Sequence, residues 1–131
     1  MKASRKKIVL IVEKTKTGFS AYSTEYAIFS SGKTISELME NSLEASNLYF
    51  EEEKIILTND NLKFEIDFKQ FFKYYRVINS KFLADKIGMN PSLLSQYVQG
   101  HKKPSNLQTE KILGGIQQIG KELSEINLIY R

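Results

Sequence analysis

The apolar positions of the chain change their period along its length, and these changes predict the order of its elements. Residues 7–13 are apolar and β-branched, which is typical of a central strand. Short runs at 19–24 and 26–29 follow, so we expect an antiparallel three-stranded meander. Thr34 and Glu37 then form a capping-box pattern that predicts the start of a helix.

This helix should cover the sheet with an apolar face made of Ile35, Leu38, Met39, Leu43 and either Tyr49 or Phe50. Two more strands are expected at 54–58 and 62–67, joined as a hairpin by an Asn/Asp turn at 59–61. The order βββα followed by one or two strands predicts an α+β domain that ends near Asp67.

From Phe68 onward the period is that of helices. The first helical stretch has an aromatic face made of Phe68, Phe71, Phe72 and Tyr75. We interpret this face as core, and stacking on nucleic acid is the alternative. Residues 106–129 carry a long amphipathic pattern interrupted at Gly114–Gly115, which indicates two helices or one kinked helix.

Between these stretches, the pattern predicts two short helices at 82–87 and 92–99 joined by a tight turn. Gly88 is suited to end the first helix in the left-handed conformation. Asn90 can cap the second helix, and Pro91 fits its first position. Two helices joined in this way are typical of a DNA-binding helix-turn-helix.

The second of these helices should have one apolar and one polar side. Leu94 and Tyr97 are expected to face the core. The exposed side then carries Ser92, Ser95, Gln96 and Gln99. Because a Gln amide can pair bidentately with adenine, we expect Gln96 to determine sequence choice. Lys102 and Lys103 follow the helix, where they can contact phosphate.

The charge of the 131-residue chain is concentrated in the half that contains this motif. Residues 1–66 carry nine Lys or Arg and ten Asp or Glu, whereas residues 67–131 carry ten and five. A positive half suits a phosphate-bearing partner. Neither a membrane-spanning apolar run nor a signal-peptide pattern occurs, so we expect a cytoplasmic protein that does not bind a membrane.

Few residues are candidates for catalysis or metal binding. The chain has no cysteine, which excludes thiolate metal sites, and its single histidine, His101, excludes a two-histidine ligand set. No acid or nucleophile stands at a recognisable spacing from His101. We therefore expect no enzymatic activity, no metal and no cofactor. The acidic run 51–53 is most simply a solvated helix end, and an edge that meets a basic partner is the alternative.

Two parts of the chain resemble known families. Residues 83–105, LADKIGMNPSLLSQYVQGHKKPS, resemble the phage-repressor (XRE-like) helix-turn-helix, a five-helix domain that would span roughly 68–120. Residues 7–26 and 30–52, KIVLIVEKTKTGFSAYSTEY and SSGKTISELMENSLEASNLYFEE, resemble the HicB antitoxin domain. HicB-like antitoxins combine a degenerate RNase-H-like domain with a DNA-binding domain, neutralise a HicA-type mRNA-cutting toxin and repress their own operon.

The resemblance implies base contacts from Ser92, Ser95 and Gln96. It also implies phosphate contacts from Gln99, Lys102 and Lys103. We accordingly expect a toxin-binding domain at 1–67 and an all-helical DNA-binding and dimerisation domain at 68–131.

Reading two half-sites requires a dimer or a larger oligomer on double-stranded operator DNA. The expected dimer contacts are Leu123, Ile126 and Ile129. One alternative is a repressor whose N-terminal domain senses a small ligand or another protein, with no toxin. A more distant alternative is a module that only binds proteins.

Overall fold

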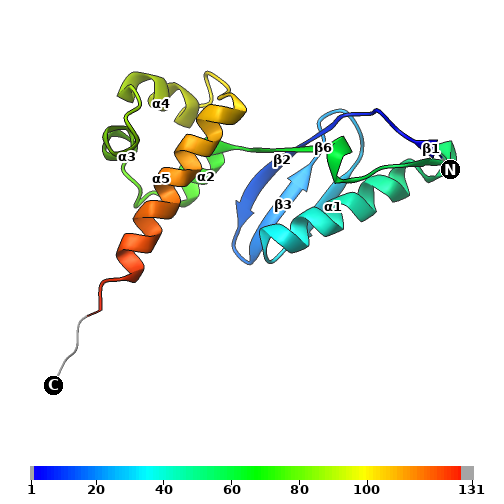
Figure 1. Ribbon diagram of the computed structural model, residues 1–131, viewed down its shortest axis with the longest axis horizontal. Helices are drawn as coiled ribbons and strands as arrows, with labels where there is room; N and C mark the ends of the chain where they lie inside the picture. Colours follow the sequence, from blue (N-terminus) through cyan, green and yellow to red (C-terminus); the bar gives the residue numbers. More distant parts are fainter. Residues whose placement is uncertain (1, 128–131) are drawn as a thin grey trace. The chain divides into compact units, whose positions relative to one another are not determined.

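The computed structural model describes residues 2–127, which divide into two compact units between Tyr74 and Tyr75 (Figure 1). The first unit is α+β and the second is helical, as the sequence predicts. No helix among these residues combines the length and the apolarity that crossing a membrane requires.

The first unit contains a four-stranded sheet with the strand order β4-β3-β2-β6. β2 (Ile8–Thr15) and β3 (Gly18–Tyr22) make a hairpin, and β4 (Phe29–Gly32) pairs antiparallel with β3. β6 (Leu62–Ile66) lies parallel to β2 on its other side, so the sheet is mixed. Alternate residues of β2 are buried in the core, namely Ile8, Leu10 and Val12.

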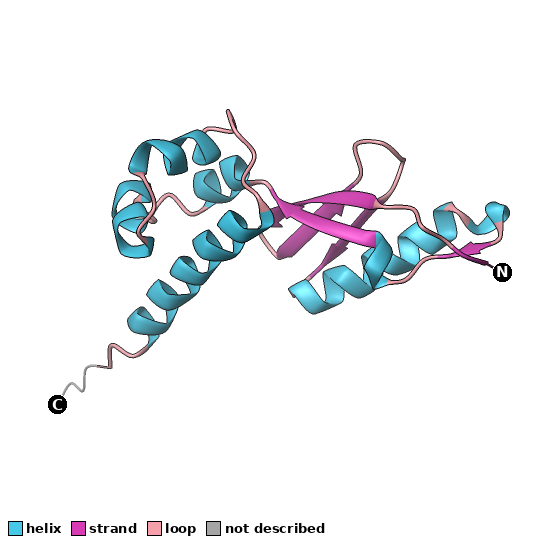
Figure 2. Ribbon diagram, turned by 45° about the horizontal axis from the view of Figure 1, so that its top comes forward, coloured by secondary structure: helices cyan, strands magenta, loops and turns pink. Residues whose placement is uncertain are grey.

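α1 (Ile35–Tyr49) packs against β3 and β4 (Figure 2). It begins as expected, because the Thr34 hydroxyl accepts a hydrogen bond from the Glu37 N–H at 3.1 Å. The prediction of its apolar face is partly wrong, because Leu38 is buried but Ile35 and Met39 are exposed.

The buried face of α1 contains two serines instead. Ser42 and Ser46 are both completely buried. The Ser42 hydroxyl shares a 2.6 Å hydrogen bond with the Ser30 hydroxyl of β4, and the Ser46 hydroxyl donates to the Ser42 carbonyl at 2.7 Å. Since every hydroxyl has a partner, small polar residues can be buried here at little cost.

The third strand begins later than the expected range 26–29. The Ser23 hydroxyl accepts hydrogen bonds from the Glu25 and Tyr26 N–H groups, at 3.1 and 2.9 Å. These bonds fold the segment into a turn, and β4 starts only at Phe29.

The expected hairpin after α1 does not form. The short turn η1 (Glu51–Glu53) leads into β5 (Ile55–Ile56), which pairs in parallel with β1 (Lys2–Ala3) rather than with β6. The turn η2 (Asn59–Asn61) then enters β6. The Asn61 amide donates to the carbonyls of Ser4 and Lys6 at 2.8 and 2.9 Å, so η2 is tied to the N-terminal segment.

α2 (Phe68–Tyr74) belongs to the first unit, so the division falls after Tyr74 and not near Asp67. The reason is the contact of α2 with β2, where the Gln70 side chain bonds to both backbone groups of Lys14. The core role expected for the aromatic face is confirmed for Phe68, Phe71 and Phe72, which are buried, whereas Tyr75 is half-buried.

The second unit contains α3 (Ser80–Ile87), α4 (Pro91–Val98) and α5 (Asn106–Ser124), and its buried residues include Leu83, Ala84, Leu94, Tyr97 and Ile112. Over roughly 68–120, where the resemblance implied a five-helix domain, the structure has four helices, namely α2 and these three. α5 is one helix that runs through Gly114 and Gly115, so the alternative of two helices separated at these glycines is wrong.

Candidate nucleic-acid interface

Local side-chain chemistry fixes the turn between α3 and α4. Gly88 ends α3 with a φ of +68°, and the Met89 N–H donates to the Ala84 carbonyl at 2.9 Å. The Asn90 side chain accepts from the Ser92 N–H at 2.8 Å and so caps α4, whose first residue is Pro91. The roles expected of Gly88, Asn90 and Pro91 are confirmed.

α4 has the two sides that the sequence predicts. Leu94 is completely buried and Tyr97 is 5% exposed, so both face the core. Of the four residues of α4 that are predicted to contact DNA, Ser92, Gln96 and Gln99 are exposed and Ser95 is half-buried. The helix is therefore held by one side and presents hydroxyl and amide groups on the other.

Two of the residues that are predicted to contact DNA, Ser95 and Gln99, are hydrogen-bonded to each other. The Gln99 side-chain N–H donates to the Ser95 hydroxyl oxygen at 3.2 Å, one helical turn apart. This bond does not use the side-chain amide oxygen of Gln99, which can still accept a hydrogen bond, or the hydroxyl hydrogen of Ser95, which can still be donated. Ser95 and Gln99 thus present one combined hydrogen-bonding group.

The loop after α4 is held against the same helix. The Gln96 carbonyl accepts from the N–H groups of His101 and Lys102, at 2.9 and 3.3 Å. Lys102 and Lys103 are both exposed. These two hydrogen bonds hold the loop that contains Lys102 and Lys103 next to the C-terminal end of α4.

A hollow of about 360 Å³ lies where α3 and α4 begin, and its lining includes Ser80, Lys81, Ser92 and Ser95. Lys81 stands in the first turn of α3, which Asn79 caps by accepting from the Phe82 N–H at 3.0 Å. Sequence reasoning missed Lys81. Its position just after a capping Asn was the available signal, because helix N-termini attract phosphate.

The segment around α4 contains basic side chains and no acidic ones. No Asp or Glu occurs from Lys86 to Thr109, a segment that includes the whole of α4 and the basic loop. A polyanion can therefore approach α4 without meeting a carboxylate from this segment.

The residues expected to form a dimer are partly described. Leu123 and Ile126 are 62% and 66% exposed, so both are accessible for contact, while Ile129 lies outside the described residues.

Across the described part of the chain, no three His, Cys, Asp or Glu side chains are grouped so that they could hold a metal ion. No protein-family model matches the chain, and neither the curated proteins nor the solved structures include a significant match to it.

Proposed function

We propose that the second unit is a helix-turn-helix that binds double-stranded DNA through the exposed side of α4. The observation that carries this proposal is the division of α4 into a buried side and a polar side next to a tethered basic loop. In a helix-turn-helix, the second helix enters the major groove while the first helix crosses the backbone.

In this proposal Ser92, Ser95 and Gln96 contact base edges. Gln99, Lys102 and Lys103 contact phosphates, and Lys81 adds a phosphate contact from the start of α3. The hydrogen bond between Ser95 and Gln99 supports the scheme because it orders two of these side chains before DNA binds.

The resemblance to HicB antitoxins extends the proposal to the whole chain. The first unit is then a degenerate RNase-H-like domain that binds and neutralises a HicA-type mRNA-cutting toxin. The second unit represses transcription of the shared operon. A dimer formed through Leu123 and Ile126 places two α4 helices on the two halves of the operator.

DNA binding is tested with the promoter DNA of the chain's own gene and a shuffled duplex. Gln96→Ala should raise the Kd for promoter DNA by about 5- to 150-fold, the equivalent of about 1–3 kcal/mol for a bidentate base contact, while the shuffled duplex is bound as before. Gln117→Ala is the matched control, since Gln117 is an exposed glutamine of α5. An equal loss of affinity for both duplexes would mean that Gln96 does not recognise the base sequence.

The antitoxin part is tested by co-expression with the neighbouring gene. A small basic product that arrests growth alone, and that co-purifies with the full chain when both are made, supports an antitoxin. A neighbour that is not toxic, together with intact promoter binding, supports the alternative of a repressor whose first unit senses a small ligand or another protein.

A further inference from the structure

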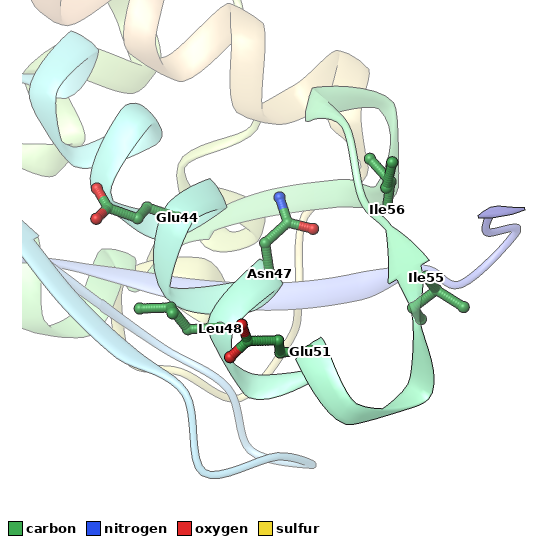
Figure 3. A pocket seen from close by; sticks show the side chains of 6 residues that line it. All are labelled: Glu44, Asn47, Leu48, Glu51, Ile55 and Ile56. Carbon is green, nitrogen blue, oxygen red and sulfur yellow. The ribbon is translucent and has the colours of Figure 1, made fainter. Parts of the chain in front are cut away.

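The first unit has an apolar groove that the DNA-binding proposal does not use. Its volume is about 370 Å³, and its lining comes from α1, η1 and β5: Glu44, Asn47, Leu48, Glu51, Ile55 and Ile56 (Figure 3). We call it the α1–β5 groove. Leu48 is 63% exposed and Ile56 is 43% exposed. Exposed apolar residues that gather in one groove mark an interaction surface more often than isolated ones do.

The α1–β5 groove is held in shape by one side chain. The Asn47 amide donates to the Leu57 carbonyl at 3.1 Å, and its oxygen accepts from the Leu57 N–H at 2.8 Å. These two bonds fix the chain just after β5 against α1. They also engage the side-chain amide of Asn47, so the groove offers mainly apolar surface. It has few polar groups that could orient a small polar ligand.

Two of the six residues that line the groove are glutamates, Glu44 and Glu51. α1 and η1 contain no Lys, Arg or His, and one exposed lysine, Lys54, follows η1. The two elements contain six Glu: Glu37, Glu40, Glu44, Glu51, Glu52 and Glu53. All six are exposed. The ion pairs of the described residues are Lys63–Glu65 and Lys86–Glu122, so none of the six belongs to an ion pair there. These charges disfavour nucleic acid and favour a basic protein segment, which would meet Glu44 and Glu51 at the groove.

We propose that the α1–β5 groove binds a segment of a partner protein in which an apolar side chain is flanked by Lys or Arg. The apolar side chain enters between Leu48 and Ile56, and the basic groups meet Glu44 and Glu51. This inference rests on the proposed function in one respect, since it places the basic toxin-like partner on this surface of the first unit.

The first experiment uses the full chain and a synthetic amphipathic helical peptide made of Leu and Lys, with a Leu and Glu peptide of the same pattern for comparison. The Leu/Lys peptide should bind at least tenfold more tightly. Glu44→Gln combined with Glu51→Gln should raise its Kd at least threefold, and so should Leu48→Asn. All three residues are exposed, so these variants should fold.

Matched controls separate the groove from net charge and from exposed leucine in general. Glu110→Gln with Glu125→Gln makes the same change in charge in α5 and at the residue that follows it, and Leu107→Asn changes a leucine that is 75% exposed. Neither control should change the Kd. Losses equal to those of the groove variants would overturn the proposal, and so would an unchanged Kd in the groove variants. A Leu48→Asn variant with an altered oligomeric mass in light scattering would overturn it in favour of a contact between copies of this chain.

The second experiment separates failure of this inference from failure of the proposed function. If the neighbouring gene product binds the groove variants as tightly as the unchanged chain, the groove assignment is wrong and the antitoxin proposal stands. If the Leu/Lys peptide binds in the groove but the neighbouring product does not bind the chain at all, the groove assignment stands and the antitoxin proposal is wrong.

Discussion

Gly115 of α5 lies directly against Ile87 of α3, closer than any residue with a side chain could lie. A β-carbon at position 115 would stand 2.3 Å from Cγ2 of Ile87 and 3.0 Å from Cδ1 of Leu83. A β-carbon on the preceding residue, Gly114, would meet no atom within 4 Å. Two neighbouring glycines that look equivalent in the sequence therefore have opposite surroundings.

Alanine substitutions at these two positions should change stability in opposite directions. Gly114→Ala should stabilise the second unit by about 0.5–1 kcal/mol, because alanine favours helix more than glycine does. Gly115→Ala gains the same propensity but forces Ile87 to move, and overpacking of this kind costs about 1–3 kcal/mol. Urea unfolding followed by circular dichroism measures both variants. Equal stabilisation by the two would contradict the close approach of α3 and α5.

The contrast between these glycines shows which features the sequence could predict. The turn between α3 and α4 was predictable because Gly88, Asn90 and Pro91 act on their own neighbours. Gly114–Gly115 was interpreted as a weak point because propensity counts glycine only as a helix breaker. The packing that requires Gly115 comes from α3, and helix periodicity in α5 contains no information about it.

Two of the differences between the predicted and the observed first unit have the same origin. The hairpin expected at 59–61 fails because the Asn61 side chain bonds to Ser4 and Lys6, which lie 57 and 55 residues away. Hydropathy cannot assign Ser42 to the core, since its burial depends on the Ser30 hydroxyl of another element. At the candidate site, the two sides of α4 followed from period alone. For Lys81, the capping Asn79 was a local signal in the sequence, but the place of Lys81 beside Ser92 and Ser95 depends on how α3 and α4 pack.

Gln70→Ala should destabilise the first unit. The Gln70 side chain accepts from the Lys14 N–H at 2.8 Å and donates to the Lys14 carbonyl at 2.7 Å, so its loss leaves two part-buried backbone groups without partners. The expected cost is about 1–3 kcal/mol. Hydrogen exchange of the Lys14 amide should accelerate as α2 loses its attachment to β2.

Lys69→Ala is the control for this substitution, because Lys69 is the exposed preceding residue of α2. It should leave both the stability and the exchange of the Lys14 amide unchanged. If Lys69→Ala had the same effect as Gln70→Ala, the helix itself rather than the Gln70 bonds would hold α2 to the sheet.

The ion pair between Lys86 and Glu122 should make the contact of α3 with α5 depend on pH. Lys86 Nζ donates to both Glu122 carboxylate oxygens, at 3.0 and 3.1 Å, and the hydrogen bond from Lys86 lowers the pKa of Glu122 below its ordinary 4.5. A lowered pKa stabilises the folded state above pH 4.5, and this contribution disappears as the pH falls through the pKa of the folded state.

Glu122→Gln should therefore lower stability slightly near neutral pH and leave it unchanged in acid. The effect should be small and should shrink in high salt, because the Glu122 side chain is exposed and screened. Thermal unfolding at a series of pH values measures it. A Glu122→Gln difference that grew toward acid pH would have the wrong sign for this ion pair.

Lys102→Ala and Lys81→Ala should each weaken DNA binding without changing sequence preference. A lysine that contacts phosphate releases a counterion, so its loss should reduce the slope of log K against log salt by about 0.9. Binding to promoter DNA and to a shuffled duplex should weaken by the same factor, in contrast to Gln96→Ala. Lys111→Ala is the control, because Lys111 is an exposed lysine of α5. A reduced slope for Lys102→Ala with an unchanged slope for Lys81→Ala would mean that the loop after α4 contacts the backbone while the start of α3 does not.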